Sequence, residues 1–348
     1  MPTASKQARA ERAFPWRGVV TWAFVLLFVW LVWNRFGDID ALVTTLRGGK
    51  PVWIGVAIAG QLLYFVLFAG IYWSAFRVVD VHMNFPKLIP LTYASIFVNT
   101  TVTSGGAAGT VLFVDEARRS GESTARATVG TILVIATDFS AFSVLLTIGV
   151  ISLIRHHEIT KLESITTLAM YMMIFGVMAL LSTGLWAPNW LRSLLVTVHG
   201  LERRISRLLR RPRSLLSDDW PERNADEFAT AAQAIVQHPV QVLRTIGIAM
   251  VAHLVDLFTL FALFLAFSQP TTLSILIMLY AMSIVFRVAS PTPNGIGIVE
   301  TVLPAIYVSV GVPLEVGTVI NLSFRGVSFW IPLVVGVFCL HSVNRNIE

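Results

Sequence analysis

The sequence Ser290-Pro-Thr-Pro-Asn-Gly-Ile-Gly297 separates two apolar stretches, Leu273–Val288 and Ile296–Val310. Proline and glycine interrupt regular helices, so this segment leaves backbone N–H and C=O groups without helical partners. At membrane depth such groups are tolerated only where they are buried in protein or line a water-filled cavity. If the chain lies in a bilayer, residues 273–310 are therefore best interpreted as a re-entrant hairpin with a broken tip.

The composition places the chain in a bilayer. Of its 348 residues, 55% are hydrophobic and only 13% are charged, whereas a soluble domain carries about 25% charged residues. A soluble enzyme with a single anchor is excluded. The single cysteine, Cys339, forms no intrachain disulfide, and the net charge of +6 reports orientation in a membrane protein rather than nucleic-acid binding.

A second interrupted stretch has the same character. Thr103-Ser-Gly-Gly-Ala-Ala-Gly109 breaks the apolar run Ile89–Val114, and we interpret it as a second re-entrant hairpin. Crossing roughly 30 Å of hydrocarbon takes about 20 apolar residues. The other apolar stretches predict six full spans: Val19–Trp33, Pro51–Phe76, Val129–Ile154, Ile165–Trp186, Val242–Phe267 and Val316–Leu340. The expected fold is an all-α, polytopic membrane protein.

The basic residues predict the orientation, because loops rich in Lys and Arg remain in the cytoplasm. The N-terminal arm, residues 1–18, is basic, and six arginines lie between the fifth and sixth spans: Arg203, Arg204, Arg207, Arg210, Arg211 and Arg213. With both segments inside, the N- and C-termini are cytoplasmic. The stripe of apolar residues in Leu191–Leu209 predicts a helix lying on an anionic leaflet. We expect the protein in the cell (inner) membrane.

This arrangement divides the chain into two halves of opposite orientation. Residues 19–154 form the first membrane repeat and residues 155–343 the second, with a cytoplasmic amphipathic insert at 187–241 and a tail at 344–348. Gly121 precedes Ala127-Thr-Val129 by the spacing at which Gly311 precedes Gly317-Thr-Val319. An inverted repeat with broken helices is typical of transporters, which bind substrate near the bilayer midplane between the halves.

The glycine-rich tips are the first candidates for binding. A helix N-terminus carries about half a positive charge and binds phosphate or carboxylate, so helices starting near Ala107 and Ile298 suit an anionic lipid headgroup. The tip residues are Gly105, Gly106, Gly109, Asn294, Gly295 and Gly297. The alternative is that these glycines only permit tight helix packing.

Ionisable residues within the spans are costly and are therefore functional hypotheses. Arg287 and Arg325 are candidates to bind phosphate oxygens, while Glu300 either holds one of these arginines or caps the second broken helix. The alternative is a set of internal ion pairs, Arg325 with Glu300 or Arg287 with Asp256. Asp138, His253 and Asp256 are secondary candidates. His253 taken alone suits a hydrogen-bonded packing role better than proton transfer. We expect neither a metal site nor a cofactor.

Together these elements resemble the lysylphosphatidylglycerol synthase transmembrane family, which is flippase-like. The resemblance rests on the first glycine element with Gly121-Glu-Ser-Thr-Ala-Arg-Ala127, and on Ser290–Glu300 with Gly311 and Arg325. It covers about Val19 to Leu340. It implies movement of an anionic or aminoacylated phospholipid, or an isoprenoid-linked headgroup, between leaflets, with Gly295, Gly297, Glu300 and Arg325 at the site.

The chain departs from that family in two respects. Its first element lacks the proline and the basic residue common in relatives, and it has Asp115-Glu116 instead. It also ends soon after the last span, so we expect no aminoacyltransferase domain and no synthesis of lysylphosphatidylglycerol. The expected partners are membrane lipids with anionic headgroups, with a lipid-modifying enzyme as a further candidate. The sequence does not indicate an oligomeric state. The alternative function is a polyprenyl-phosphate-sugar-dependent glycosyltransferase, suggested by Asp38-Ile-Asp40 in the first external loop.

Overall fold

The computed structural model describes residues 48–101, 108–156, 161–186, 220–290 and 292–345. These residues form helices and turns, with no β-strand among them. The all-α prediction is thus confirmed for this part of the chain. The predicted span Val19–Trp33, the basic arm and most of the amphipathic insert lie outside the described residues.

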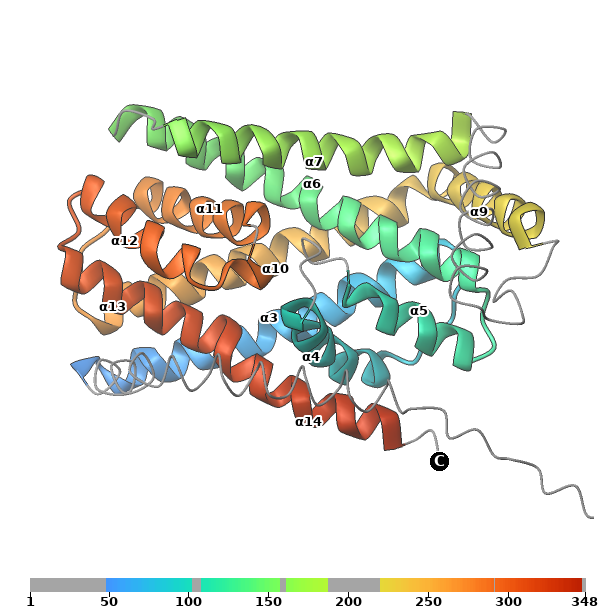
Figure 1. The fold of residues 1–348 in the computed structure, drawn as a ribbon, viewed down its shortest axis with the longest axis horizontal. Helices are drawn as coiled ribbons and strands as arrows, with labels where there is room; N and C mark the ends of the chain where they lie inside the picture. The colour runs from blue at the N-terminus through green and yellow to red at the C-terminus, as the bar shows by residue number, and fades with distance from the viewer. Residues whose placement is uncertain (1–47, 102–107, 157–160, 187–219, 291, 346–348) are drawn as a thin grey trace, which may run out of the picture. The chain divides into compact units, whose positions relative to one another are not determined.

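The helices follow the order of the apolar stretches (Figure 1). They are α3 (Pro51–Val78), α4 (Phe85–Thr101), α5 (Thr110–Arg119), α6 (Thr124–His156), α7 (Lys161–Trp186), α9 (Trp220–Gln237), α10 (Pro239–Ala266), α11 (Leu273–Ala289), α12 (Ile298–Ser309), α13 (Leu314–Arg325) and α14 (Ile331–Arg345), with a 3₁₀ turn, η1 (Pro293–Gly295), and a π-helical turn, η2 (Gly326–Trp330), that joins α13 to α14.

Four helices in the described part are long and apolar enough to cross a membrane: Pro51–Val78, Thr124–Arg155, Pro239–Ala266 and Leu314–Cys339. They confirm four of the six predicted spans. In the described part of α7 the apolar helix is Ser164–Ala179, which is shorter than a span, so the count of six is not confirmed. The protein is a multi-pass membrane protein, and the other apolar helices in its described part are short.

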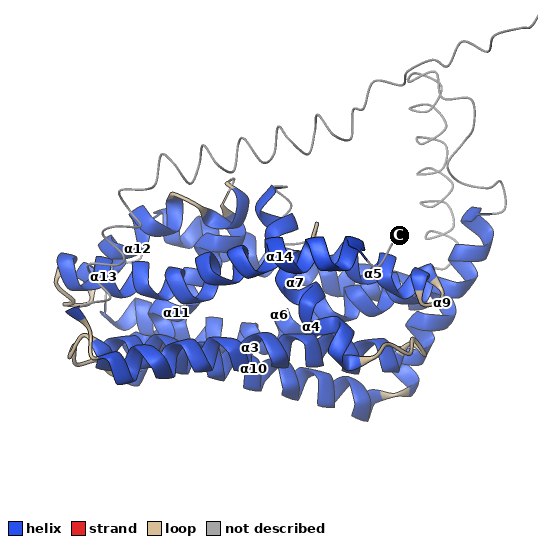
Figure 2. Ribbon diagram, turned by 90° about the horizontal axis from the view of Figure 1, so that it is seen from below, coloured by secondary structure: helices blue, strands red, loops and turns tan. Residues whose placement is uncertain are grey.

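The long helices α3 and α10 run antiparallel, side by side (Figure 2). The start of α3 meets the end of α10, where the Lys50 N–H donates to the Ala266 carbonyl at 2.9 Å. Further along, the Ser74 and Thr245 hydroxyls are 2.7 Å apart. A Cβ atom added to Gly60 would lie 2.6 Å from Thr259 Oγ1, so glycine permits the close approach of the two helices, as small residues do in membrane bundles.

Two short helix pairs occupy different ends of this bundle. In Figure 1, α11 and α12 lie on the left, and α4 and α5 lie toward the right. Helix α11 packs on α6 and α4 packs on α14, while the end of α4 also contacts η1. Helix α4 and the turn η1 before α12 are therefore in contact inside the bundle.

The turns that follow α3 and α5 resemble the turns that follow α10 and α12. Helices α3 and α10 both have 28 residues with proline in the first turn, and each ends in a turn containing a residue with positive φ, Asp80 at 57° and Ser268 at 55°. Helices α4 and α11 begin five residues later in each case and both have 17 residues. Gly121 and Gly311, at φ 85° and 83°, then precede α6 and α13 by three residues.

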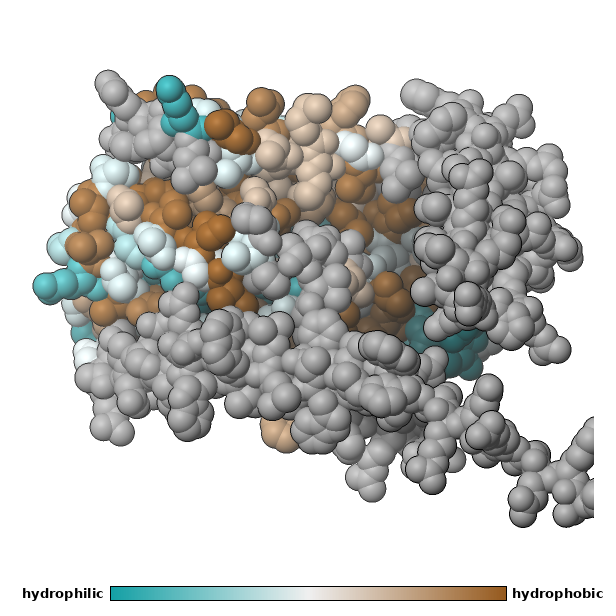
Figure 3. Space-filling model, in the orientation of Figure 1, coloured by the Kyte–Doolittle hydropathy of each residue, from teal (hydrophilic) through white to brown (hydrophobic). Residues whose placement is uncertain are grey.

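The outer face of the bundle is apolar. Large apolar side chains are exposed on α3, α7, α10 and α14, including Leu62, Phe175, Phe258 and Phe338. Figure 3 shows apolar residues across the visible middle of the described bundle and polar residues at its ends. A soluble protein seldom exposes such a continuous apolar surface, which is the surface that hydrocarbon chains cover in a bilayer.

Candidate functional site

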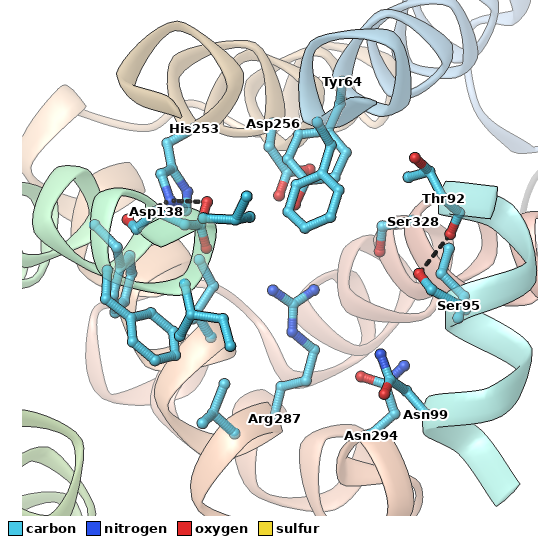
Figure 4. A pocket seen from close by; sticks show the side chains of 18 of the residues that line it. Tyr64, Thr92, Ser95, Asn99, Asp138, His253, Asp256, Arg287, Asn294 and Ser328 are labelled. Atoms are coloured by element: carbon cyan, nitrogen blue, oxygen red, sulfur yellow. Dashed lines mark hydrogen bonds and ion pairs between the residues drawn. The ribbon is translucent and has the colours of Figure 1, made fainter. Parts of the chain in front are cut away.

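A cavity of about 410 Å³ lies between α4 and the segment that joins α11 to α12 (Figure 4). Helices α3, α4, α6, α10 and α11, the 290–294 loop and η2 contribute to its wall. The aliphatic and aromatic lining is interrupted by polar side chains: Gln61, Tyr64, Tyr72, Thr92, Ser95, Asn99, Thr110, Asp138, His253, Asp256, Arg287, Ser290, Thr292, Asn294 and Ser328. A mostly apolar cavity with a few converging polar groups is the usual form of a small-molecule site.

Arg287 supplies the positive charge of this cavity. It lies in the last turn of α11, where a cation is favoured by the helix dipole, and its guanidinium points into the open space in Figure 4. No described residue forms a hydrogen bond or an ion pair with it. The predicted ion pair of Arg287 with Asp256 is thus not formed at contact distance, although both side chains line the same cavity. A guanidinium with no contacting partner among the described residues is suited to binding a phosphate.

The loop before α12 is held in a conformation that requires its glycines. Asn294, Gly295 and Gly297 have φ values of 52°, 74° and 85°, a region that other L-residues rarely adopt. An added Cβ on Gly295 would also lie 2.9 Å from Arg287 Cα. This glycine therefore lets the loop fold back against the residue that carries the cavity's positive charge.

Replacing Gly295 with alanine is expected to destabilise the protein more than replacing Gly311. Both glycines have positive φ, which costs a residue with a Cβ about 1–2 kcal/mol, but nothing lies within 4 Å of a Cβ added at Gly311. The difference between the two variants measures the close contacts of the added Cβ at Gly295, which would lie 2.6 Å from Val299 Cγ2 and 2.9 Å from Arg287 Cα. Apparent melting temperatures in detergent measure it, and equal losses would contradict a tight loop.

Each loop has one polar side chain that binds a glycine N–H. Asn99 Oδ1 accepts from Gly109 N at 2.6 Å, and Glu300 Oε2 accepts from Gly297 N at 2.8 Å. The predicted capping role of Glu300 is thus confirmed. These two amide groups are not free to bind a phosphate in this structure. Anion binding by the other amides of these helix N-termini stays a prediction, and Arg287 is the second candidate contact.

Glu300 also forms a buried ion pair with Arg325. Arg325 Nε donates to Glu300 Oε1 at 2.8 Å, and the two side chains are 3% and 11% exposed. Arg325 also donates to the Asn294 carbonyl at 3.3 Å, and its guanidinium lies 4.3 Å from the centre of the Phe329 ring. This pair, anticipated as an alternative, connects the loop to α13 and η2 and gives both residues a structural role.

The acidic side of the cavity faces Arg287. Asp138 comes from α6, and His253 and Asp256 come from α10. His253 is in contact with Asp138 and with the hydroxyl of Tyr280, which in turn contacts Asp256. Two carboxylates and one guanidinium thus share a space inside the bundle. Among the described residues, no group of three or more His, Cys, Asp or Glu side chains is arranged to hold a metal ion.

The structure brings part of the predicted site together. Arg287, Asn294, Asp138, His253 and Asp256 line the cavity. The predicted residues that are not in its lining are Gly109, Gly295, Gly297, Glu300 and Arg325, which form or support the two loops. Gly105, Gly106, Asp38 and Asp40 lie outside the described residues. Whether any of these residues binds substrate stays a prediction.

Sequence reasoning missed several polar side chains of the cavity. Gln61 and Tyr64 from α3 and Ser328 from η2 lie in the wall, and Gln61 is 3% exposed. Its Oε1 atom has no hydrogen-bond partner among the described residues. An amide in the middle of an apolar span was the available signal, because polar residues there usually mark a pathway or a site.

Comparisons with known proteins agree with this picture. The family model described as the lysylphosphatidylglycerol synthase TM region matches residues 18–336. A curated relative from Methanocaldococcus jannaschii, the UPF0104 membrane protein MJ1595, is 22% identical over 329 residues, which are 92% of this chain and 94% of that protein. No solved structure matches the chain at a significant level.

Proposed function

The chain belongs to the lysylphosphatidylglycerol synthase TM region family, and from that premise we propose that it is a lipid translocase. It moves an anionic or aminoacylated phospholipid, or an isoprenoid-linked headgroup, between the leaflets of the cell membrane. The observation that carries this proposal is Arg287, a cation without a protein partner among the described residues, in a cavity surrounded by lipid-facing helices.

The chemistry of the cavity suits a phospholipid headgroup. A guanidinium recognises phosphate through paired hydrogen bonds, and the amides of Asn99 and Asn294 lie beside it (Figure 4). The aromatic and aliphatic remainder of the lining suits the first carbon atoms of the lipid. Because the charge of the headgroup opposes its passage through hydrocarbon, a polar cavity inside the bundle lowers the barrier to that passage.

The finer architecture belongs to the same proposal. We infer six full spans and two re-entrant hairpins, arranged as two repeats of opposite orientation. The antiparallel course of α3 and α10, their equal lengths and the matching turns at Asp80 and Ser268 and at Gly121 and Gly311 support this inference. In transporters with inverted repeats, one half rocks against the other around a central site. The cavity between α4 and the 290–294 segment corresponds to that site in this proposal.

Purified protein in liposomes tests the proposal. The probe is phosphatidylglycerol with a fluorescent acyl chain, placed in one leaflet, and a membrane-impermeant quencher reports its appearance in the other. We expect faster exchange than in protein-free liposomes, and slower exchange of a labelled phosphatidylcholine. Failure to accelerate any anionic lipid, by protein whose melting transition is intact, would contradict a translocase.

A further inference from the structure

Three buried side chains, His253, Tyr280 and Asp256, form a continuous hydrogen-bonded path beside the cavity, and the backbone carbonyl of Asp138 accepts at its end. We call these three residues, together with the partly buried Asp138, the proton chain. His253 Nε2 lies 3.3 Å from both the carbonyl and the carboxylate of Asp138, and only the contact with the carbonyl has hydrogen-bond geometry. His253 Nδ1 is 2.8 Å from the Tyr280 hydroxyl, and that hydroxyl is 3.3 Å from Asp256 Oδ2.

Counting protons shows what this path needs. A carbonyl oxygen only accepts, so His253 Nε2 carries a proton that it donates to Asp138. Tyr280 has a single hydroxyl proton and cannot donate to His253 Nδ1 and Asp256 at once. The reference state has a neutral His253 imidazole, a Tyr280 hydroxyl and an ionised Asp256. All three hydrogen bonds form together only when these side chains hold one proton more than in that state.

That proton has two possible places. Either His253 Nδ1 carries it and Tyr280 donates to Asp256, or the Asp256 carboxyl carries it and Tyr280 donates to His253. Transfer of the Tyr280 hydroxyl proton to Asp256, together with transfer of the His253 Nδ1 proton to the Tyr280 oxygen, converts the first arrangement into the second. Chains of Asp, Glu and His inside membrane proteins commonly conduct protons in this way.

The charge of the cavity links this proton to the cargo. With the extra proton, the charges of the proton chain and Arg287 cancel, and without it the cavity has a net charge of −1. A phosphate bound at Arg287 adds a further negative charge in a space where unbalanced charge is expensive. Proton and phosphate therefore bind more tightly together than apart, and by linkage each favours the other.

We propose that the proton chain is the coupling site of the transporter and that one proton crosses the membrane with each anionic headgroup. This inference rests on the proposed translocase function. The other charged or titratable groups around the chain come from α3 and α11: Tyr64, Tyr72 and Arg287. Helix α7 contributes to the cavity wall only the apolar residues Met173 and Val177.

The experiment uses the full-length protein in liposomes with trace fluorescent phosphatidylglycerol. The phosphodiester of this lipid stays ionised near neutral pH, so a pH gradient does not act on the lipid itself. One arm measures exchange at equal pH from one labelled leaflet. The other arm starts with label in both leaflets, applies a gradient with the membrane potential clamped at zero, and measures the leaflet ratio.

Coupling of one proton to one lipid predicts accumulation in the leaflet that faces the alkaline side. A gradient of about one pH unit should give a ratio of up to roughly tenfold, because one unit corresponds to 1.36 kcal/mol. Reconstitution in both orientations does not alter this ratio, since it is set by thermodynamics. Adding a proton–potassium exchanger should return the ratio to one.

Tyr280→Phe breaks the proton chain at its centre while retaining the ring. The matched control is Ser283→Ala, which removes another buried hydroxyl from the same helix; it donates to the Tyr280 carbonyl and is not in the cavity lining. We expect a ratio near one for Tyr280→Phe and the wild-type ratio for Ser283→Ala. If Tyr280→Phe lowers the melting temperature, Asp256→Asn interrupts the proton chain at a different residue and serves as a second test.

The outcomes separate the two proposals. Exchange at equal pH with an even distribution under the gradient overturns proton coupling and leaves the translocase intact. A wild-type response from both Tyr280→Phe and Asp256→Asn overturns the assignment to this chain. Absence of exchange at equal pH removes the translocase, and the coupling inference falls with it.

Discussion

Replacing Arg287 with glutamine is expected to reduce the exchange of phosphatidylglycerol by roughly 10- to 100-fold. A hydrogen bond to a charged group contributes about 1.5–3 kcal/mol, and this guanidinium is the candidate phosphate contact. Its removal also leaves Asp138 and Asp256 facing the cavity without a cation, so an anion is repelled. Arg287→Lys should retain part of the activity, because it keeps the charge but not the paired donors.

The folded state should tolerate this substitution. No described residue forms a hydrogen bond or ion pair with Arg287, so its replacement leaves no direct partner unsatisfied. Arg118→Gln is the matched control, since Arg118 is 65% exposed and pairs with Asp115 at the end of α5. Exchange and the melting transition are measured on both variants. Wild-type exchange in Arg287→Gln would place the phosphate contact elsewhere.

Much of this fold could be predicted because membrane burial leaves strong signals. Apolar stretches of spanning length predicted α3, α6, α10 and the helix that continues from α13 into α14. The glycine and proline segment 290–297 predicted a break, and the structure has three residues with positive φ there, Asn294, Gly295 and Gly297. Helix α7, Lys161–Trp186, lies where the span Ile165–Trp186 is predicted, and the apolar helix identified in its described part is Ser164–Ala179.

The site was less predictable than the fold because it depends on distant contacts. Sequence spacing did not reveal which arginine pairs with Glu300, since Arg325 lies 25 residues away. Nor did it show that Tyr280 lies between His253 and Asp256. The sequence predicts a hydrogen-bonded packing role for His253, and the structure identifies its hydrogen-bond partners, Tyr280 and the Asp138 carbonyl. Only tertiary structure joins the three side chains.

Breaking the ion pair of Glu300 and Arg325 is expected to have the largest effect on stability. Arg325→Ala leaves the carboxylate of Glu300 without its cation, although that side chain is only 11% exposed. Removal of one partner from a buried pair costs about 3–5 kcal/mol. The same substitution removes the hydrogen bond to the Asn294 carbonyl and the contact with the Phe329 ring. We expect an early melting transition in detergent.

Removing both charges together should recover most of this loss. In the double variant Glu300→Gln, Arg325→Met, the glutamine oxygen still accepts from Gly297 N and no unpaired charge remains. Replacement of a buried pair by neutral groups is often close to neutral in stability. The exposed pair of Arg119 and Asp115, which are 40% and 31% exposed, is the control, and Arg119→Ala should cost about 1 kcal/mol or less.

The double variant also decides what the pair does for transport. If it is folded and exchanges phosphatidylglycerol normally, Glu300 and Arg325 support the loop and do not bind the lipid. If it is folded but inactive, the prediction that both residues contact substrate is supported. Because Arg325 holds the Asn294 carbonyl beside the cavity, a structural role predicts that Arg325→Ala alone loses part of its exchange in proportion to its loss of stability. A double variant no more stable than Arg325→Ala would contradict the charge-balance explanation.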